Sequence, residues 1–175
     1  MTNEQKALEI ERLLSDPTNI NNVAWGYLKL GLEAEDRLDW DDAIEQYQRV
    51  IELAPEDKKV RYFGYNNRAY ALLMLKRFEE AESHCISAIE VDNDRHNAYK
   101  NLGLACEGLG RPIDAATSFI NAAFRNGTDE RAWLHLQKLL TANPDVLAQK
   151  PVLVEQMEAI RKHYEAYYGG VPKLN

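Results

Sequence analysis

Three alanines, each set in a similar run of residues, constrain the fold of this chain most strongly. Ala43, Ala81 and Ala115 are separated by 38 and then by 34 positions. The runs around them read WDDAIEQYQRVIELAP, RFEEAESHCISAIEVDN and RPIDAATSFINAAFRNG. Self-similarity at a period of about 34 residues is typical of stacked helical hairpins, in which each hairpin buries its apolar face against the next. The chain is therefore expected to be all-α and built from repeats.

A frame that places each alanine at position twenty brings similar residues into register in all three repeats. Position four is aromatic, position eight is small, and position twenty-seven is apolar. These residues are Tyr27, Tyr65 and Tyr99, then Gly31, Ala69 and Gly103, then Val50, Ala88 and Ala122. The pattern resembles the tetratricopeptide repeat over roughly 24–129. The resemblance implies a right-handed α-α superhelix, a tetratricopeptide-like solenoid, with extra helices at both ends.

Hydrophobic periodicity predicts nine helical segments in a single domain. A leading helix over about 3–14 precedes repeats at about 24–57, 58–95 and 96–129. Capping helices over about 129–168 are expected to cover the apolar end of the stack, followed by a flexible tail over 169–175. The hairpins themselves are predicted at about 20–37 with 40–53, 60–75 with 78–91, and 95–109 with 112–125.

The longer first spacing leaves four residues, 58–61, outside the repeat frame. They lie between Pro55 and Tyr62. Because about 3.6 residues make one helical turn, four added residues nearly preserve the phase of an apolar helix face. We therefore expect the first helix of the second repeat to begin one turn early. A loose loop is the alternative.

Charge is unevenly distributed along the chain. The net charge is -7, but residues 1–57 hold five Lys and Arg against fourteen Asp and Glu, a net of -9, and the remainder carries +2. Clustered basic residues are confined to short pieces such as 58–61, so we expect no nucleic-acid partner. The N-terminal residues lack the features of a secretory signal, and no run approaches the roughly 18 apolar residues of a membrane span. We expect a cytoplasmic protein without a membrane partner.

The residue types that could suggest chemistry fall on scaffold positions of the repeats. Cys85 and Cys106 occupy packing positions, and no Cys or His spacing favours a metal site. His84 is adjacent to Cys85, but neighbouring residues on a helix point about 100° apart and do not face each other as base and nucleophile. Paired acids such as Glu79-Glu80 precede the repeat alanine, and no glycine-rich phosphate loop is present. We expect no enzymatic activity, no metal and no cofactor.

In tetratricopeptide stacks the first helix of each hairpin lines a concave groove. Asn67 and Asn101 occupy the same groove position in successive repeats. The resemblance implies that they contact the backbone of a bound peptide, because an amide group both donates and accepts hydrogen bonds. The alternative is that the two asparagines cap or solvate the groove without a ligand.

The same frame places apolar and basic residues in the groove. Phe63, Tyr70 and Leu73 are expected to anchor a ligand, and Lys29 and Lys100 to select its polar groups. The alternative is that the leading helix, or the tail of another copy, covers the apolar residues.

Members of the family that bind the acidic C-termini of heat-shock chaperones do so with a carboxylate clamp of Lys, Arg and Asn residues. The corresponding positions here hold Leu28, Leu32, Asn67, Asn97 and Asn101. Only Asn67 fits the clamp, and without its cations the groove cannot neutralise a terminal carboxylate. This co-chaperone role is not expected.

The sequence thus predicts a protein-protein interaction module that binds a peptide or a helix of an unidentified partner in its groove. Two alternatives remain open at this stage. One is a secretion-type chaperone for an apolar export substrate. The other is a structural self-assembly subunit, which would make the chain a homo-oligomer.

Overall fold

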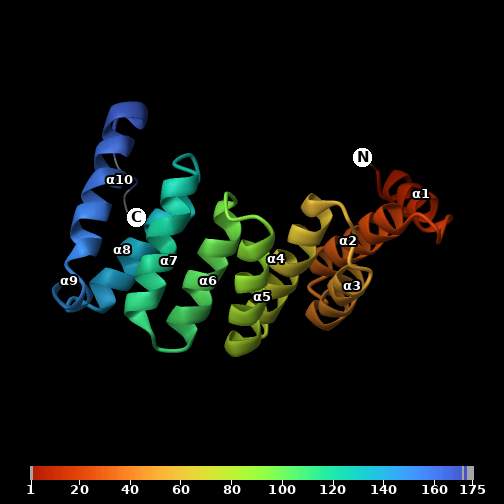
Figure 1. Ribbon diagram of the computed structural model, residues 1–175, viewed down its shortest axis with the longest axis horizontal. Coiled ribbons are helices and arrows are strands. Elements are labelled where there is room, and N and C mark those ends of the chain that lie inside the picture. Colours follow the sequence, from red (N-terminus) through yellow and green to blue (C-terminus); the bar gives the residue numbers. More distant parts are fainter. Residues whose placement is uncertain (1, 171, 173–175) are drawn as a thin grey trace. The chain divides into compact units, whose positions relative to one another are not determined.

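The computed structural model describes residues 2–170 and 172, and these residues form helices joined by short turns (Figure 1). The chain divides between Asp92 and Asn93 into two compact units, each of which is described by itself. The first unit contains α1 (Asn3–Leu14), α2 (Ile20–Asp36), α3 (Trp40–Glu52), α4 (Lys58–Met74) and α5 (Phe78–Val91). The second contains α6 (His96–Gly108), α7 (Pro112–Arg125), α8 (Glu130–Ala142), α9 (Val146–Gln149) and α10 (Val152–Tyr168). The all-α fold class is confirmed, whereas the single-domain organisation stays a prediction.

Helix α4 begins one turn early, as the phase of its apolar face predicts. Asp57 caps this helix, and its carboxylate accepts hydrogen bonds from the backbone N–H of Lys59 at 2.8 Å and of Val60 at 3.4 Å. Val60 is fully buried, so the added turn contributes an apolar side chain to the core. The four residues outside the repeat frame are thus helical and do not form a loop.

The turn inside each hairpin has the same backbone geometry in all three repeats. Leu38, Lys76 and Gly110 have φ values of 59°, 58° and 70°. In each turn the following residue donates its N–H to a carbonyl five residues earlier, such as Asp39 to Ala34 at 2.9 Å. This is the Schellman ending of a helix, which favours glycine at the left-handed residue. Only Gly110 meets that preference.

Helices within a hairpin approach closely where a glycine faces an aromatic ring. A Cβ atom added at Gly31 would collide with the ring of Tyr47, and one added at Gly103 would collide with the ring of Phe119. The second repeat has a larger residue, Ala69, at the corresponding position. The ring is replaced there by the smaller side chain of Cys85, and both residues are fully buried.

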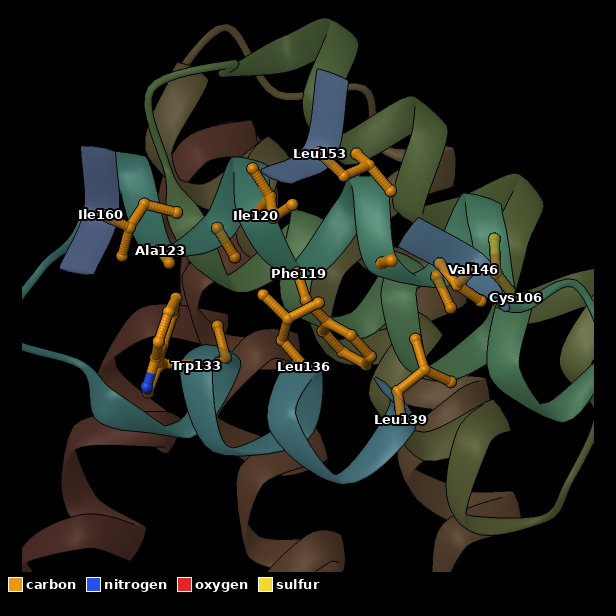
Figure 2. Close-up of a cluster of buried hydrophobic side chains, with 14 of the residues drawn as sticks. Cys106, Phe119, Ile120, Ala123, Trp133, Leu136, Leu139, Val146, Leu153 and Ile160 are labelled. Carbon is orange, nitrogen blue, oxygen red and sulfur yellow. The ribbon is translucent and has the colours of Figure 1, made fainter. Parts of the chain in front are cut away.

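The core of the second unit extends from α7 to the helices that follow the repeats. Figure 2 shows Phe119 and Ile120 of α7 among side chains from α8 and α10. Trp133 of α8 packs against Tyr164 of α10, with ring centroids 5.8 Å apart. Leu153 is fully buried. The end helices therefore cover the apolar side of α7.

The one-turn helix α9 and the predicted tail complete the second unit. Nine segments were expected from the sequence, and α9 is not among them. Its Val146 is 2% exposed, and Lys150 beyond it donates a hydrogen bond to Thr117 of α7 at 3.1 Å. Of the predicted tail, residues 171 and 173–175 lie outside the described residues.

Candidate functional site

The predicted groove residues belong to three helices in the two units. Lys29 lies on α2, and four residues lie on α4. Lys100 and Asn101 lie on α6, in the second unit. The residues on α4 are Phe63, Asn67, Tyr70 and Leu73. The predicted groove residues therefore form two groups, one in each unit.

The two aromatic residues on α4 are half-buried and held by edge-to-face ring contacts. The ring of Phe63 lies 6.4 Å from that of Trp25, and the ring of Tyr70 lies 5.9 Å from that of Trp40. Such contacts restrict the side chains while leaving part of each ring accessible. Leu73, by contrast, is only 6% exposed and is part of the core.

Asn67 belongs to a polar network that joins three helices of the first unit. Its side-chain oxygen accepts a hydrogen bond from Asn66 at 3.0 Å, and its amide group hydrogen-bonds the hydroxyl of Tyr47. That hydroxyl donates to Glu35 of α2 at 2.7 Å. The amide of Asn67 therefore has internal partners, a use that the repeat pattern alone did not assign.

The network also shifts the acidity of its members. Burial raises the pKa of Tyr47 far above its ordinary value, and its hydrogen bond to Glu35 adds to the increase. Burial likewise raises the pKa of Glu35, although the hydrogen bond from Tyr47 opposes that change. Sequence reasoning placed Tyr47 among the packing residues. Cys85 and Phe119 hold the corresponding positions and have no hydroxyl. The hydroxyl of Tyr47 was therefore the sequence signal that could have revealed the network.

Lys29 is paired with the leading helix. Its Nζ lies 3.1 Å from Oε2 of Glu9 on α1, and a second pair joins Lys6 to Asp36 at 3.4 Å. Both pairs are partly exposed. The leading helix therefore contacts one of the predicted binding residues, and its covering of the apolar groove residues stays an alternative.

The two predicted residues on α6 are almost completely buried. Asn101 is 2% exposed and Lys100 is 8% exposed. The pKa of His135 is lowered mainly by burial, and the positive charge of Lys100 lowers it further. Their roles as ligand contacts stay predictions, and little of either side chain is accessible in this structure.

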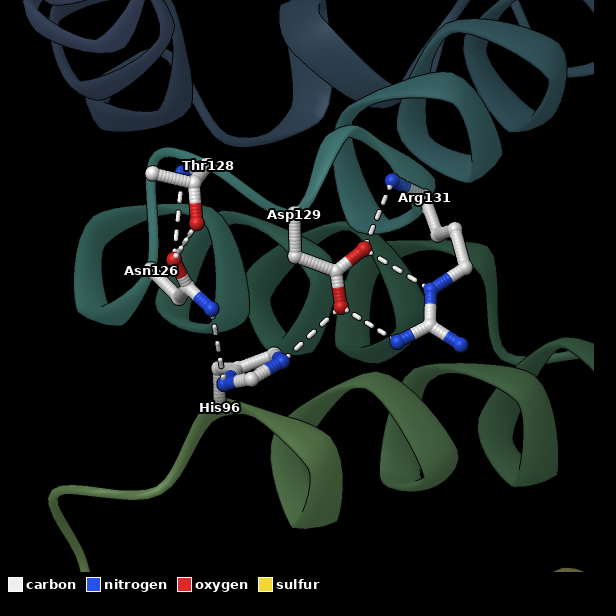
Figure 3. A network of polar contacts seen from close by, with 5 residues as sticks. All are labelled: His96, Asn126, Thr128, Asp129 and Arg131. Carbon is white, nitrogen blue, oxygen red and sulfur yellow. Dashed lines mark hydrogen bonds and ion pairs between the residues drawn. The ribbon is translucent and has the colours of Figure 1, made fainter.

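A second polar network fixes the start of α8 onto α6, as Figure 3 shows. Nε2 of His96 lies 2.8 Å from Oδ2 of Asp129, which also binds the guanidinium of Arg131 at 2.6 Å. The hydrogen bonds from Arg131 lower the pKa of Asp129, and the one from His96 acts in the same direction. Asp129 is at the same time the N-cap of α8. The network therefore joins consecutive first helices, as the 3.0 Å bond from Trp25 to Asp57 does in the first unit.

The cysteines and His84, which could in principle serve in catalysis, are buried or half-buried in the protein. Cys85 and Cys106 are buried thiols, as predicted. The ring of His84 stacks on Tyr65 at 6.0 Å, and burial together with the charge of Arg68 lowers the pKa of His84 to about 4. Among the described residues, no group of three His, Cys, Asp or Glu side chains is arranged to hold a metal ion. Within the same part of the chain, no helix combines the length and the apolar character needed to cross a membrane.

Known proteins resemble this chain in sequence and in fold. No family model matches it. It is 42% identical over 145 residues to the heat shock protein STI1 of Saccharomyces cerevisiae, covering 75% of this chain and 24% of that protein. The chain spans between a fifth and a quarter of the length of the first curated relatives that it matches.

Two solved structures at 27% identity resemble the chain closely in fold. The TPR domain of Arabidopsis OM64 matches with a TM-score of 0.64, covering 71% of this chain and 98% of that domain. The TPR2B domain of yeast Sti1, solved as a complex with pHsp70, matches with a TM-score of 0.59 and covers 73% and 98% respectively. The repeat register, the paired helices and these similarities agree. The chain is a tetratricopeptide repeat protein.

Proposed function

We propose that this chain is a protein-protein interaction module, not an enzyme, and that it binds a peptide or a helix of a partner protein. The support is its similarity to tetratricopeptide proteins, one of which was solved with a pHsp70 ligand. The proposed surface is the face of α2 and α4 in the first unit. The partner's identity and the expected cytoplasmic location are left as predictions.

One side of α4 combines aromatic and amide side chains, and this supports the proposal most directly. Phe63, Asn67 and Tyr70 are spaced by four and then three residues on α4, so they lie on one side of the helix. Met74, one turn further on, is 41% exposed. This side of α4, which we call the α4 face, presents two aromatic rings with an amide between them. Aromatic anchors of this kind commonly dominate the binding energy of an interface.

Asn67 retains hydrogen-bonding capacity for a ligand. An amide side chain offers two N–H donors and an oxygen with two lone pairs. Asn66 uses one lone pair and Tyr47 engages the amide group, as described above. One donor and one acceptor site remain, which is the pair that an extended peptide backbone requires. The internal contacts fix the orientation of the amide in advance, which reduces the entropy lost on binding.

The other predicted residues have less direct roles in the proposal. Leu73 is part of the core, and Asn101 and Lys100 hold groove positions on α6 in the second unit. Lys29 supplies the cation at the edge of the surface on α2. Because Leu28 and Leu32 stand where a carboxylate clamp needs polar and basic residues, the partner is expected to present apolar groups instead of an acidic C-terminus.

Affinity capture tests the proposal. The tagged wild-type chain and the variants Asn67→Ala and Tyr70→Ala are used to capture partners from a cell extract, which are quantified by mass spectrometry. Ile86→Ala is the matched control, because Ile86 is an exposed apolar residue on α5, at 45% exposure. We expect both α4 variants to lose partners that the control retains, with unchanged circular dichroism. Equal capture by all four proteins would refute the assignment.

A further inference from the structure

Helix α1 occupies the place of the second helix of a preceding repeat. Gly26 of α2 and Gly64 of α4 hold the same position in their repeats. A Cβ atom added at Gly64 would lie 2.8 Å from Val50 of α3, the second helix of the first hairpin. One added at Gly26 would lie 2.6 Å from Leu14, at the end of α1. α1 therefore packs on α2 much as α3 packs on α4.

The contact between α1 and α2 is less tightly packed than the corresponding contact between α3 and α4. Val50 of α3 is fully buried where it meets Gly64, whereas Leu14 of α1 is only half-buried where it meets Gly26, and Leu8 is 59% exposed. A cavity of about 110 Å³ remains between the two helices, lined by Ile10, Leu32 and the charged side chains around them. The 12-residue helix is also too short to be stable by itself. Once detached from α2, it would unfold.

We propose that α1 is an exchangeable cap, and that an amphipathic helix of a partner protein displaces it and packs on α2 in its place. The ion pairs between α1 and α2 define the chemistry of the partner. Lys29 faces the carboxylate of Glu9, and Asp36 faces the ammonium of Lys6. The incoming helix therefore carries an acidic residue for Lys29, a basic residue for Asp36, and a larger apolar side chain that fills the cavity beside Leu32.

This inference extends the proposed function, because it rests on the assignment of Lys29 to the binding surface. Its mechanism is a competition between a tethered helix and a free one. A short flexible tether gives its helix an effective concentration of about 1 mM, so the wild-type cap resists all but tightly binding competitors. Weakening the tethered helix alone should open the surface to a free helix.

A synthetic peptide of residues 2–15, which is α1 with its capping residue, serves as the probe. Binding of the labelled peptide to the full chain is followed by fluorescence anisotropy. The variant Ile10→Ala weakens only the tethered cap, because the probe keeps its isoleucine. We expect it to bind the probe at least about tenfold more tightly than the wild type, because the tethered helix has lost a buried side chain that the probe keeps. Adding Gly26→Ala should abolish the gain, because the new methyl group overlaps Leu14 of either helix.

Hydrogen exchange gives a second measurement that needs no probe. Glu9→Lys and Lys29→Glu should each increase the exchange of α1 amides by up to about fivefold, the value of a partly exposed ion pair. The double variant should restore slow exchange, and Val154→Ala on α10 should leave it unchanged.

Three results would overturn the proposal: equal probe binding by the wild type and Ile10→Ala, no restoration in the charge-swapped double variant, or exchange of α1 between two copies of Ile10→Ala, seen as a dimer by light scattering. The last result would assign the surface to a second copy. None of these measurements involves the α4 face, so the proposed function and the exchangeable cap can fail separately.

Discussion

Glycine at the two strained hairpin turns should stabilise the protein, and loss of glycine at the third should destabilise it. Leu38 and Lys76 have the left-handed backbone conformation that Gly110 also adopts. All three residues hold the same position in their repeats, and the surrounding hydrogen bonds are alike. The variants Leu38→Gly, Lys76→Gly and Gly110→Ala therefore form a series in which the same backbone preference acts in opposite directions.

Two opposing backbone terms set the size of the effect on the free energy of unfolding. A residue with a Cβ atom pays about 1–2 kcal/mol in the left-handed conformation. Glycine loses about 0.5–1 kcal/mol more backbone entropy on folding. The difference leaves a net gain of about 0.5–1 kcal/mol for each change to glycine. Packing adds little, because Leu38 is 70% exposed and a Cβ atom added at Gly110 has no neighbour within 4 Å.

Urea unfolding followed by circular dichroism measures these changes. We expect higher midpoints for Leu38→Gly and Lys76→Gly and a lower midpoint for Gly110→Ala, with unchanged slopes. In thermal unfolding, 1 kcal/mol corresponds to about 2–4 °C for a chain of this size. Leu38→Ala controls for the lost side chain, since it keeps the strained backbone. If Leu38→Gly and Leu38→Ala changed stability equally, backbone strain would not be the cause.

Two further predictions concern buried polar groups. Since burial and the charge of Arg68 lower the pKa of His84 from 6.5 to about 4, the unfolded chain binds this proton more readily than the folded one. The free energy of unfolding should therefore decrease as the pH falls from 6.5 to about 4. In urea titrations, His84→Gln should weaken this dependence on pH. The same pH dependence in the variant and the wild type would contradict the role of His84. Tyr47→Phe removes the hydroxyl that donates to Glu35 and should cost about 1.5–3 kcal/mol of unfolding free energy. The exposed Tyr167, replaced by phenylalanine, is the control, and equal stability of both variants would count against the network.

The repeat frame predicted the paired helices well, because the same packing positions recur in all three repeats. The early start of α4 followed from helical phase alone, since four residues make nearly one turn and Val60 then faces the core. Helix α9 was missed because its single turn is too short to show a period. The strained turns at Leu38 and Lys76 were also invisible, because neither residue type favours a positive φ.

The candidate site was harder to predict. The repeat frame indicates on which side of a helix a residue lies, but it does not indicate which side chains pack against that residue. It placed Phe63 and Tyr70 on an accessible surface, and both are half-buried there. It treated Asn67 and Asn101 as equals. In the structure Asn67 joins the network of Tyr47, whereas Asn101 is 2% exposed. Such differences depend on neighbours from other repeats, which a single-repeat pattern does not contain.

The first hairpin pairs the small Gly31 with the large Tyr47, and the second pairs Ala69 with the smaller Cys85. The packing surfaces of these two hairpins therefore differ in shape. Exchanging Tyr47 and Cys85 would drive a phenol ring into Ala69 and leave an empty space beside Gly31. The second helix of the second hairpin therefore cannot substitute for that of the first, although the two look alike in sequence. This mismatch disfavours pairing of a first helix with the wrong second helix, and so it protects the first two repeats from folding out of register.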